Sequence, residues 1–180
     1  PQVALIQQAA AAWSSAATGA SVNLVETNNQ AAADITITNA PLFFPSGTTA
    51  TTTIPAGVAP DSHLLREITD ATVTLDSFGF FPWHNDPNTP VPPGFFDFYS
   101  TILRGFGSSL GLGFATTDGA SVMDTFLLPG ESHLALSPGD ISALATLYGT
   151  PEPATLTLFG LGLLGVGLPR RSRNRVGRTS

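Results

Sequence analysis

The sequence predicts a mixed α/β (α+β) domain over residues 1–149 and a separate C-terminal segment over residues 150–180. Apolar residues recur at helical spacing in three parts of the first segment, and they alternate with polar residues in two others, as in half-buried strands. The composition then changes abruptly near residue 150, where an uncharged run leads into a cluster of arginines. We therefore expect one domain with three helices, followed by a hydrophobic C-terminal helix.

The first half of the domain predicts one helix and two strands. Residues 33–38 and 71–76 alternate apolar and polar side chains, which predicts two half-buried strands. Residues 41–61 and 77–94 are rich in proline, and we expect both to form long loops. The helix comes first, is interrupted at Gly19, and is predicted from the spacing of Val3, Ile6, Ala10 and Trp13.

Two further helices are predicted in the second half. Residues 98–110 carry apolar side chains at helical spacing, and Asp97 can cap the first turn. Another helix should begin at Ser137, because Ser at the N-cap, Pro at the first helical position and Asp at the third form a strong start signal. Gly149 supplies its C-terminal stop. The apolar face of this helix should carry Ile141, Leu144, Ala145 and Tyr148.

The charge distribution excludes one class of partner. Charged residues make up 11% of the chain, and its net charge is −6. Before residue 150 the only basic residues are Arg66 and Arg104. Nucleic-acid binding needs clustered Lys or Arg to neutralise phosphates, so we do not expect a nucleic-acid partner. The chain has no cysteine, which excludes a disulfide framework.

The C-terminal segment has three parts. Pro151-Glu152-Pro153 breaks any preceding helix, and residues 154–168 form an uncharged apolar run. A helix of that length spans roughly 22 Å, against a hydrocarbon core of about 30 Å, so it is a marginal membrane span. The positive charges that follow would hold the C-terminus in the cytoplasm and leave the domain on the other side. They are Arg170, Arg171, Arg173, Arg175 and Arg178.

This order of parts resembles the PEP-CTERM sorting signal of Gram-negative bacteria that carry exosortases. The resemblance implies export, an intermediate tethered in the inner membrane through residues 154–168, and processing by an exosortase-type partner near the proline triplet. It also implies a final location at the cell surface or in the extracellular matrix. Because Pro1 is not an initiator, we expect the sequence to be a fragment or a processed form whose N-terminal part is missing. The residues of the signal are Pro151, Glu152, Pro153, Arg170 and Arg171.

Residues 96–114 resemble the active helix of matrixin-type (metzincin) metallopeptidases, whose signature H-E-x-x-H-x-x-G-x-x-H precedes a Met-turn. Three other segments resemble matrixin elements and follow the same order along the chain. Trp13 resembles the residue through which the first helix of that family packs. The resemblance covers roughly residues 2–149 and lacks only an expected N-terminal strand. It implies a zincin-like domain with a twisted, mostly parallel sheet. The three segments are residues 33–37 for the central strand, 121–123 for the Met-turn at Met123, and 136–149 for the closing helix.

The chain departs from the matrixin signature at every position that carries the chemistry. If Gly111 aligns with the glycine of the signature, Arg104 and Ser108 occupy the two helical histidine positions. Phe114 occupies the third histidine position, and Gly105 replaces the general-base glutamate. Zinc needs lone pairs from imidazole, thiolate or carboxylate, whereas a guanidinium is a permanent cation without an acceptor. Although the family would use zinc, we expect none at this helix and no catalytic residue.

Other candidate residues have simpler interpretations. Gly105 and Gly107 each cost a helix up to about 1 kcal/mol relative to alanine, so we expect a loosened helix or a short irregular segment. We expect Met123 to belong to the core. His63, His84 and His133 are interpreted as surface histidines, and a structural zinc or calcium site at His84 with Asp86, or at His63 with Asp61, is a weak alternative. The acids Asp118, Asp124 and Glu131 are interpreted as solvated loop residues.

Phenylalanines gather in the predicted loops. They are expected to pack beneath those loops, and a peptide-binding cleft is the alternative. The six residues are Phe43, Phe44, Phe80, Phe81, Phe95 and Phe96.

The leading functional hypothesis is an exported, catalytically inactive matrixin-like domain that acts as an extracellular or surface binding or structural protein. An extracellular polypeptide or polysaccharide matrix would be its partner. The alternative is a zinc-dependent metalloendopeptidase with relocated ligands, for example His133 with Asp118 or Asp124. A third hypothesis is a decaying gene product without a selected function.

Overall fold

The computed structural model describes residues 1–17, 22–42, 50–53, 70–77, 82–115 and 119–149. The chain divides into two compact units, Pro1–Gly149 and Thr150–Ser180, and all the described residues belong to the first. The sorting segment with its expected hydrophobic helix lies outside the described residues, as do Asp61, His63 and Asp118.

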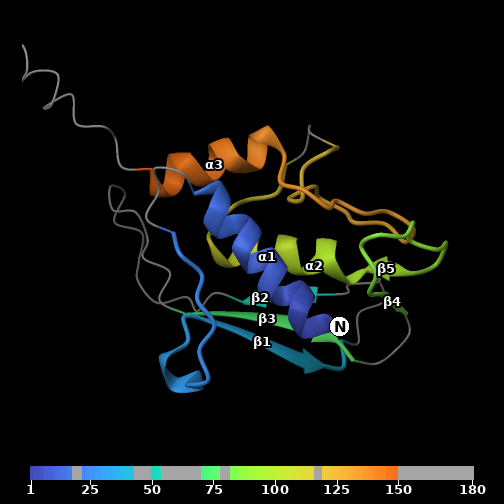
Figure 1. Ribbon diagram of the computed structural model, residues 1–180, viewed down its shortest axis with the longest axis horizontal. Coiled ribbons are helices and arrows are strands. Elements are labelled where there is room, and N and C mark those ends of the chain that lie inside the picture. Colours follow the sequence, from blue (N-terminus) through green and yellow to red (C-terminus); the bar gives the residue numbers. More distant parts are fainter. Residues whose placement is uncertain (18–21, 43–49, 54–69, 78–81, 116–118, 150–180) are drawn as a thin grey trace, which may run out of the picture. The chain divides into compact units, whose positions relative to one another are not determined.

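A three-stranded sheet forms one layer of the first unit (Figure 1). Its strands are β1 (Ile35–Ala40), β2 (Ala50–Thr53) and β3 (Ala71–Asp76), in the order β1-β3-β2. β1 runs parallel to β3, whereas β2 runs antiparallel to it. A second, two-stranded parallel sheet pairs β4 (Trp83–His84) with β5 (Phe96–Asp97). The mixed α/β class predicted from the sequence is confirmed.

Both strands predicted from alternation are present, with Ala71, Val73 and Leu75 of β3 buried as expected. The prediction of uninterrupted loops is wrong in two places, because β2 lies within residues 41–61 and β4 within residues 77–94. β2 contains three β-branched threonines, and its pairing with β3 outweighs the flanking proline and glycine. β4 is too short for an alternating pattern to be visible. A 3₁₀ turn, η1 (Gln30–Ala32), precedes β1.

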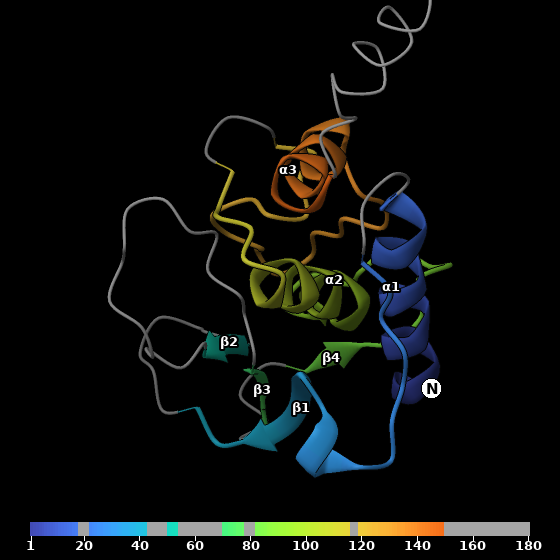
Figure 2. The same ribbon diagram turned by 90° about the vertical axis from the view of Figure 1, so that its left-hand side faces the viewer.

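Three α-helices lie on one side of the three-stranded sheet, as the two perpendicular views show (Figure 1, Figure 2). They are α1 (Gln2–Ala16), α2 (Phe98–Ser109) and α3 (Pro138–Tyr148). The predicted caps are confirmed: the Asp97 carboxylate accepts a hydrogen bond from the Ser100 backbone N–H, and Ser137 and Asp140 form a reciprocal capping box.

The predicted apolar face of α1 is wrong by a small rotation. Val3 is 61% exposed, whereas the buried row consists of Leu5, Ala9 and Trp13. Apolar residues surround most of this helix, so spacing alone did not identify the row that faces the core. On α3, Leu144 alone of the predicted face is buried, and Ile141 is 38% exposed.

Helix α2 is the centre of the core. Ten of its twelve residues are buried, and it contacts α1, β2 and β3. A helix buried on nearly all sides needs close neighbours rather than a single apolar stripe. From α1, the Trp13 indole Nε1 donates a buried hydrogen bond to the Leu103 carbonyl at 2.8 Å.

The two glycines of α2 permit this close packing. A Cβ atom at Gly107 would lie 2.5 Å from Met123 Sδ and 2.8 Å from Trp13 Cζ2. At Gly105 it would lie 2.8 Å from Val73 Cγ1. The helix is continuous through both positions, which corrects the expectation of a loosened or irregular segment. The glycines cost helix propensity, but they let α1, β3 and residue 123 approach the helix backbone.

A buried carboxylate joins α3 to the turn that precedes it. Asp140 is 2% exposed, and its Oδ2 accepts hydrogen bonds from the backbone N–H groups of Ser137 (2.8 Å) and Val122 (3.1 Å). Its Oδ1 accepts a third from the Ser121 hydroxyl at 2.5 Å. Several donors offset the cost of burying the charge, so one aspartate fixes both the start of α3 and residues 121–123.

We predict that Gly107→Ala destabilises the domain despite the better helix propensity of alanine. Overpacking a dense core costs about 1–3 kcal/mol, and the propensity gain returns at most about 1 kcal/mol. Because the added Cβ atom would crowd two buried side chains, the cost should lie in the upper part of that range. Chemical denaturation should therefore show a net loss of about 1–2 kcal/mol in the free energy of unfolding. Gly113→Ala is the matched control, because a Cβ atom there would meet nothing within 4 Å. Equal stability of the two variants would contradict this account of the core.

Candidate functional site

The structure brings together two of the residues that align with matrixin zinc positions. The Arg104 guanidinium extends from α2 and lies 4.8 Å from the centre of the Phe114 ring. Its Nη2 donates a hydrogen bond to the Thr125 carbonyl at 2.8 Å. The Ala115 N–H donates to the Met123 carbonyl at 2.7 Å, which holds the two ends of the intervening loop together. Arg104 therefore links α2 to both ends of this loop.

The chemistry of this contact does not fit a divalent metal. Burial lowers the pKa of Arg104, and the negative charge of Asp124 opposes that shift. A guanidinium nevertheless stays protonated in proteins and has no lone pair to offer. Phe114 is 61% exposed and presents only a ring. The arrangement is a cation–π pair, which is attractive by itself and presents a fixed positive charge.

The other aligned positions carry no ligating or basic group. Gly105, at the general-base position, is buried against Val73 of the sheet, and Ser108 is half-buried on α2. Met123 lies in the predicted turn, is 1% exposed and packs in the hydrophobic core. Its backbone N–H donates to the Ser121 hydroxyl at 3.0 Å. Met123 thus packs against Gly107 of α2 inside the hydrophobic core.

The candidate metal site in the loop before α2 is held by local hydrogen bonds. His84 Nε2 lies 3.1 Å from the Thr89 carbonyl oxygen and 3.3 Å from the Thr89 hydroxyl. Asp86 Oδ1 accepts a hydrogen bond from the Asn88 N–H at 3.0 Å. This bond, together with the one from the Asn88 side chain, lowers the pKa of Asp86. Both side chains therefore take part in a turn over residues 84–89.

A serine, an aspartate and a histidine meet at the start of α2, but the histidine contributes only its backbone. The buried Ser100 hydroxyl donates to Asp97 Oδ2 at 2.5 Å and accepts from the His133 N–H at 2.7 Å. Burial raises the pKa of the neighbouring Tyr99, and the negative charge of Asp97 adds to that shift. Sequence reasoning identified Asp97 as a cap and missed this contact to residue 133, because its partner is a backbone group. The arrangement ties a loop to the helix and exposes no nucleophile.

Metal-ligand clusters are absent from the part of the chain that the structure describes: no three His, Cys, Asp or Glu residues there could hold one ion. Among the loop phenylalanines, Phe96 is buried and Phe95 half-buried. The other four lie outside the described residues.

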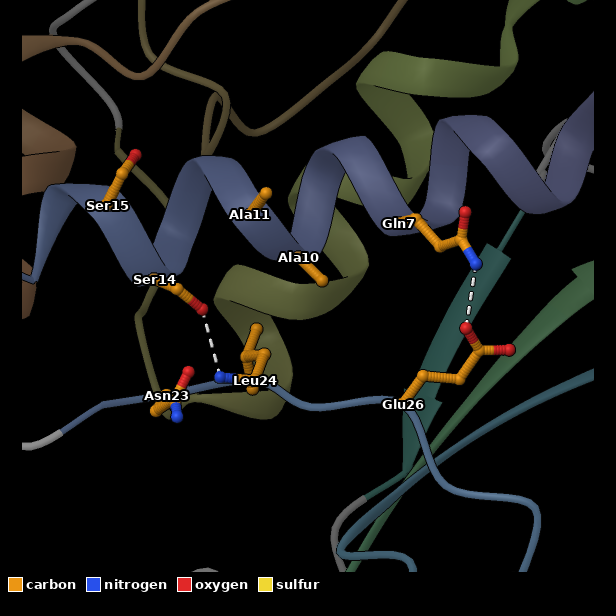
Figure 3. A pocket seen from close by; sticks show the side chains of 8 residues that line it. All are labelled: Gln7, Ala10, Ala11, Ser14, Ser15, Asn23, Leu24 and Glu26. Atoms are coloured by element: carbon orange, nitrogen blue, oxygen red, sulfur yellow. Dashed lines mark hydrogen bonds between the residues drawn. The ribbon is translucent and has the colours of Figure 1, made fainter.

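A shallow groove of about 510 Å³ runs between α1 and residues 23–26 (Figure 3). The Gln7 amide donates to Glu26 Oε2 at 2.7 Å across it, and the Ser14 hydroxyl accepts from the Leu24 N–H at 2.9 Å. Ala10 and Ala11 are among the residues that line it, and Glu26 is the one titratable residue among them. These hydrogen bonds fasten the chain after α1 to the helix.

Comparison with known proteins identifies the C-terminal segment. Residues 150–171 match the PEP-CTERM protein-sorting motif, which confirms the sorting signal predicted from the sequence. The chain is therefore an exported protein that an exosortase processes at the membrane. Its final location is the cell surface or the extracellular space. No curated protein matches the chain. The matrixin-type interpretation of residues 1–149 stays a prediction.

None of the helices that the structure describes is long and apolar enough to cross a membrane. The apolar run of residues 154–168 lies outside that description.

We predict that Arg104 and Phe114 stabilise the domain jointly. A double-mutant cycle with Arg104→Ala and Phe114→Ala should give a favourable coupling of about 0.5–1 kcal/mol, the value of a partly exposed cation–π pair. The measurement is the free energy of unfolding of the two single variants, the double variant and the unchanged protein. Additive single effects would mean that the two side chains do not interact in solution.

Proposed function

We propose that the exported domain is a matrixin-like pseudoenzyme that acts as a binding or structural protein outside the cell. The sorting motif supports the extracellular location, and the residues of α2 support the lack of zinc chemistry. The observation that carries the proposal is the Arg104–Phe114 contact at 4.8 Å. It occupies positions at which a matrixin would present two imidazoles to zinc.

Zinc-dependent hydrolysis needs the metal ligands and the general base at the same time, and this chain lacks both at the matching positions. A bound zinc ion polarises substrate and activates water, and a neighbouring carboxylate removes the proton of that water. Here two positions offer an arginine and a phenylalanine, the third a serine, and the base position a glycine packed on β3. No single substitution restores such a set. A polypeptide substrate could still contact the surface, but no group near Arg104 would cleave it.

A peptidase with relocated ligands receives less support from the geometry. His133 and Asp124 were the described candidates for that alternative. The His133 backbone is tied to Ser100 at the start of α2. Burial lowers the pKa of Arg104, and the negative charge of Asp124 opposes that shift. A divalent ion held at Asp124 would therefore add positive charge close to a guanidinium that is permanently cationic.

We predict that the purified, exported chain holds no stoichiometric zinc after equilibration with the ion and does not hydrolyse casein or gelatin. Elemental analysis after removal of free metal provides the first measurement, and release of soluble peptides provides the second. A known matrixin treated identically is the positive control for both. Stoichiometric zinc that disappears in the Phe114→Ala variant would overturn the proposal, and so would chelator-sensitive proteolysis.

A further inference from the structure

The face of the three-stranded sheet turned away from α2 carries two rows of threonines. On β1 and β3 the inward positions are taken by the apolar residues that pack towards α2, and successive side chains of a strand point to opposite faces. The threonines therefore share the outer face. The parallel register of β1 and β3 sets them side by side in two rows that cross both strands. One row consists of Thr36 and Thr72, and the other of Thr38 and Thr74.

These rows form a regular grid of hydroxyl and methyl groups. Neighbouring strands are about 4.8 Å apart, and alternate residues of one strand are about 6.6–6.8 Å apart. Among the described residues, the hydroxyls of Thr36, Thr38, Thr72 and Thr74 have no hydrogen-bond partner. Thr38 is exposed, and the other three are half-buried. All three α-helices lie on the opposite side of the sheet (Figure 1, Figure 2).

An open hollow of about 600 Å³ lies over one end of this grid. Two exposed carboxylates, Asp34 and Asp70, stand immediately before β1 and β3. They are neighbours, because the N–H of the residue after Asp70 donates to the Asp34 carbonyl at 2.8 Å. The polar residues that line the hollow are Gln30, Asp34, Thr36, Thr38, Asp70 and Thr72.

The chemistry of this surface selects among extracellular ligands. Threonine hydroxyls both donate and accept hydrogen bonds, the amide of Gln30 does the same, and carboxylates accept. None of the side chains that line the hollow is cationic, and two are anionic. An anionic polymer would therefore be repelled. A neutral ligand with many hydroxyl groups could donate hydrogen bonds to the carboxylates and exchange hydrogen bonds with the threonine hydroxyls. The threonine methyl groups would contact its C–H groups.

We propose that this threonine face binds a neutral polysaccharide outside the cell. Adjacent strands of a sheet are rotated by about 20–25°, so the grid follows a solvated, flexible chain better than a flat crystalline lattice. The inference rests on the proposed function in one respect, namely that the exported domain acts by binding.

The test is affinity electrophoresis of the full exported chain in gels that contain hydroxyethyl cellulose or glucomannan as neutral probes, and alginate as an anionic probe. Both neutral polymers should retard the protein, and alginate should not. The double variant Thr36→Val, Thr72→Val keeps the shape and the strand propensity and removes two hydroxyls. It should bind at least about tenfold more weakly, because the polymer loses two hydrogen bonds to the protein.

Thr146→Val is the matched control, since Thr146 is an exposed threonine on α3, far in sequence from the sheet. It should leave the retardation unchanged, and circular dichroism should show that every variant is folded. Absence of retardation by both neutral polymers overturns the inference. So does equal retardation of the double variant, equal binding of alginate, or self-association of the protein through the same face. Zinc content and proteolysis, measured on the same preparation, report separately on the pseudoenzyme proposal.

Discussion

The fold depends on how closely other elements approach the backbone of α2. Gly107 leaves room for both Trp13 of α1 and Met123 of the following turn, which meet where its side chain would stand. Gly105 does the same for Val73 of β3. Trp13 then spans from α1 to α2 through its indole hydrogen bond to the Leu103 carbonyl. A larger side chain at either glycine would separate the sheet, α1 and the turn from the helix that they share.

On the matrixin interpretation proposed above, contacts between side chains also explain how the domain keeps its fold without zinc. In a matrixin, zinc would connect the active helix to the loop after it. Here, hydrogen bonds and a ring contact make that connection: Arg104 reaches Phe114 and the Thr125 carbonyl, and Asp140 holds Ser121 and Val122 from the other side. The buried Asp140 carboxylate accepts several hydrogen bonds, which offset the cost of removing its charge from water, and the half-buried Arg104 guanidinium makes one hydrogen bond and one ring contact. On the interpretation proposed above, side-chain contacts have taken over a structural role that a metal would otherwise have.

Local signals in the sequence predicted the elements better than the packing between them. The caps at Asp97 and Ser137 were predictable, because a helix start depends on hydrogen bonds within one turn. The strands at residues 35–40 and 71–76 were predictable from alternation. The inward face of α1 was not, because apolar residues surround that helix. The packing that requires Gly105 and Gly107 could not be predicted either, because the side chains that it involves come from other elements: Val73 for Gly105, and Trp13 and Met123 for Gly107. At the candidate site, the sequence identified Arg104 and Phe114 as unsuited to zinc, but not their contact with each other.

The most direct test of the account is to ask whether the fold still holds its three ligand positions at metal-binding spacing. Arg104→His, Ser108→His and Phe114→His would be combined in one variant and titrated with Co²⁺, whose visible absorption reports tetrahedral coordination. The same variant without Phe114→His is the control, and circular dichroism checks that both are folded. The account predicts one tightly bound, tetrahedral Co²⁺ per chain in the triple variant and much weaker binding in the control. A folded triple variant that binds no Co²⁺, or binds it no better than the control, would contradict the zincin-like interpretation of this domain.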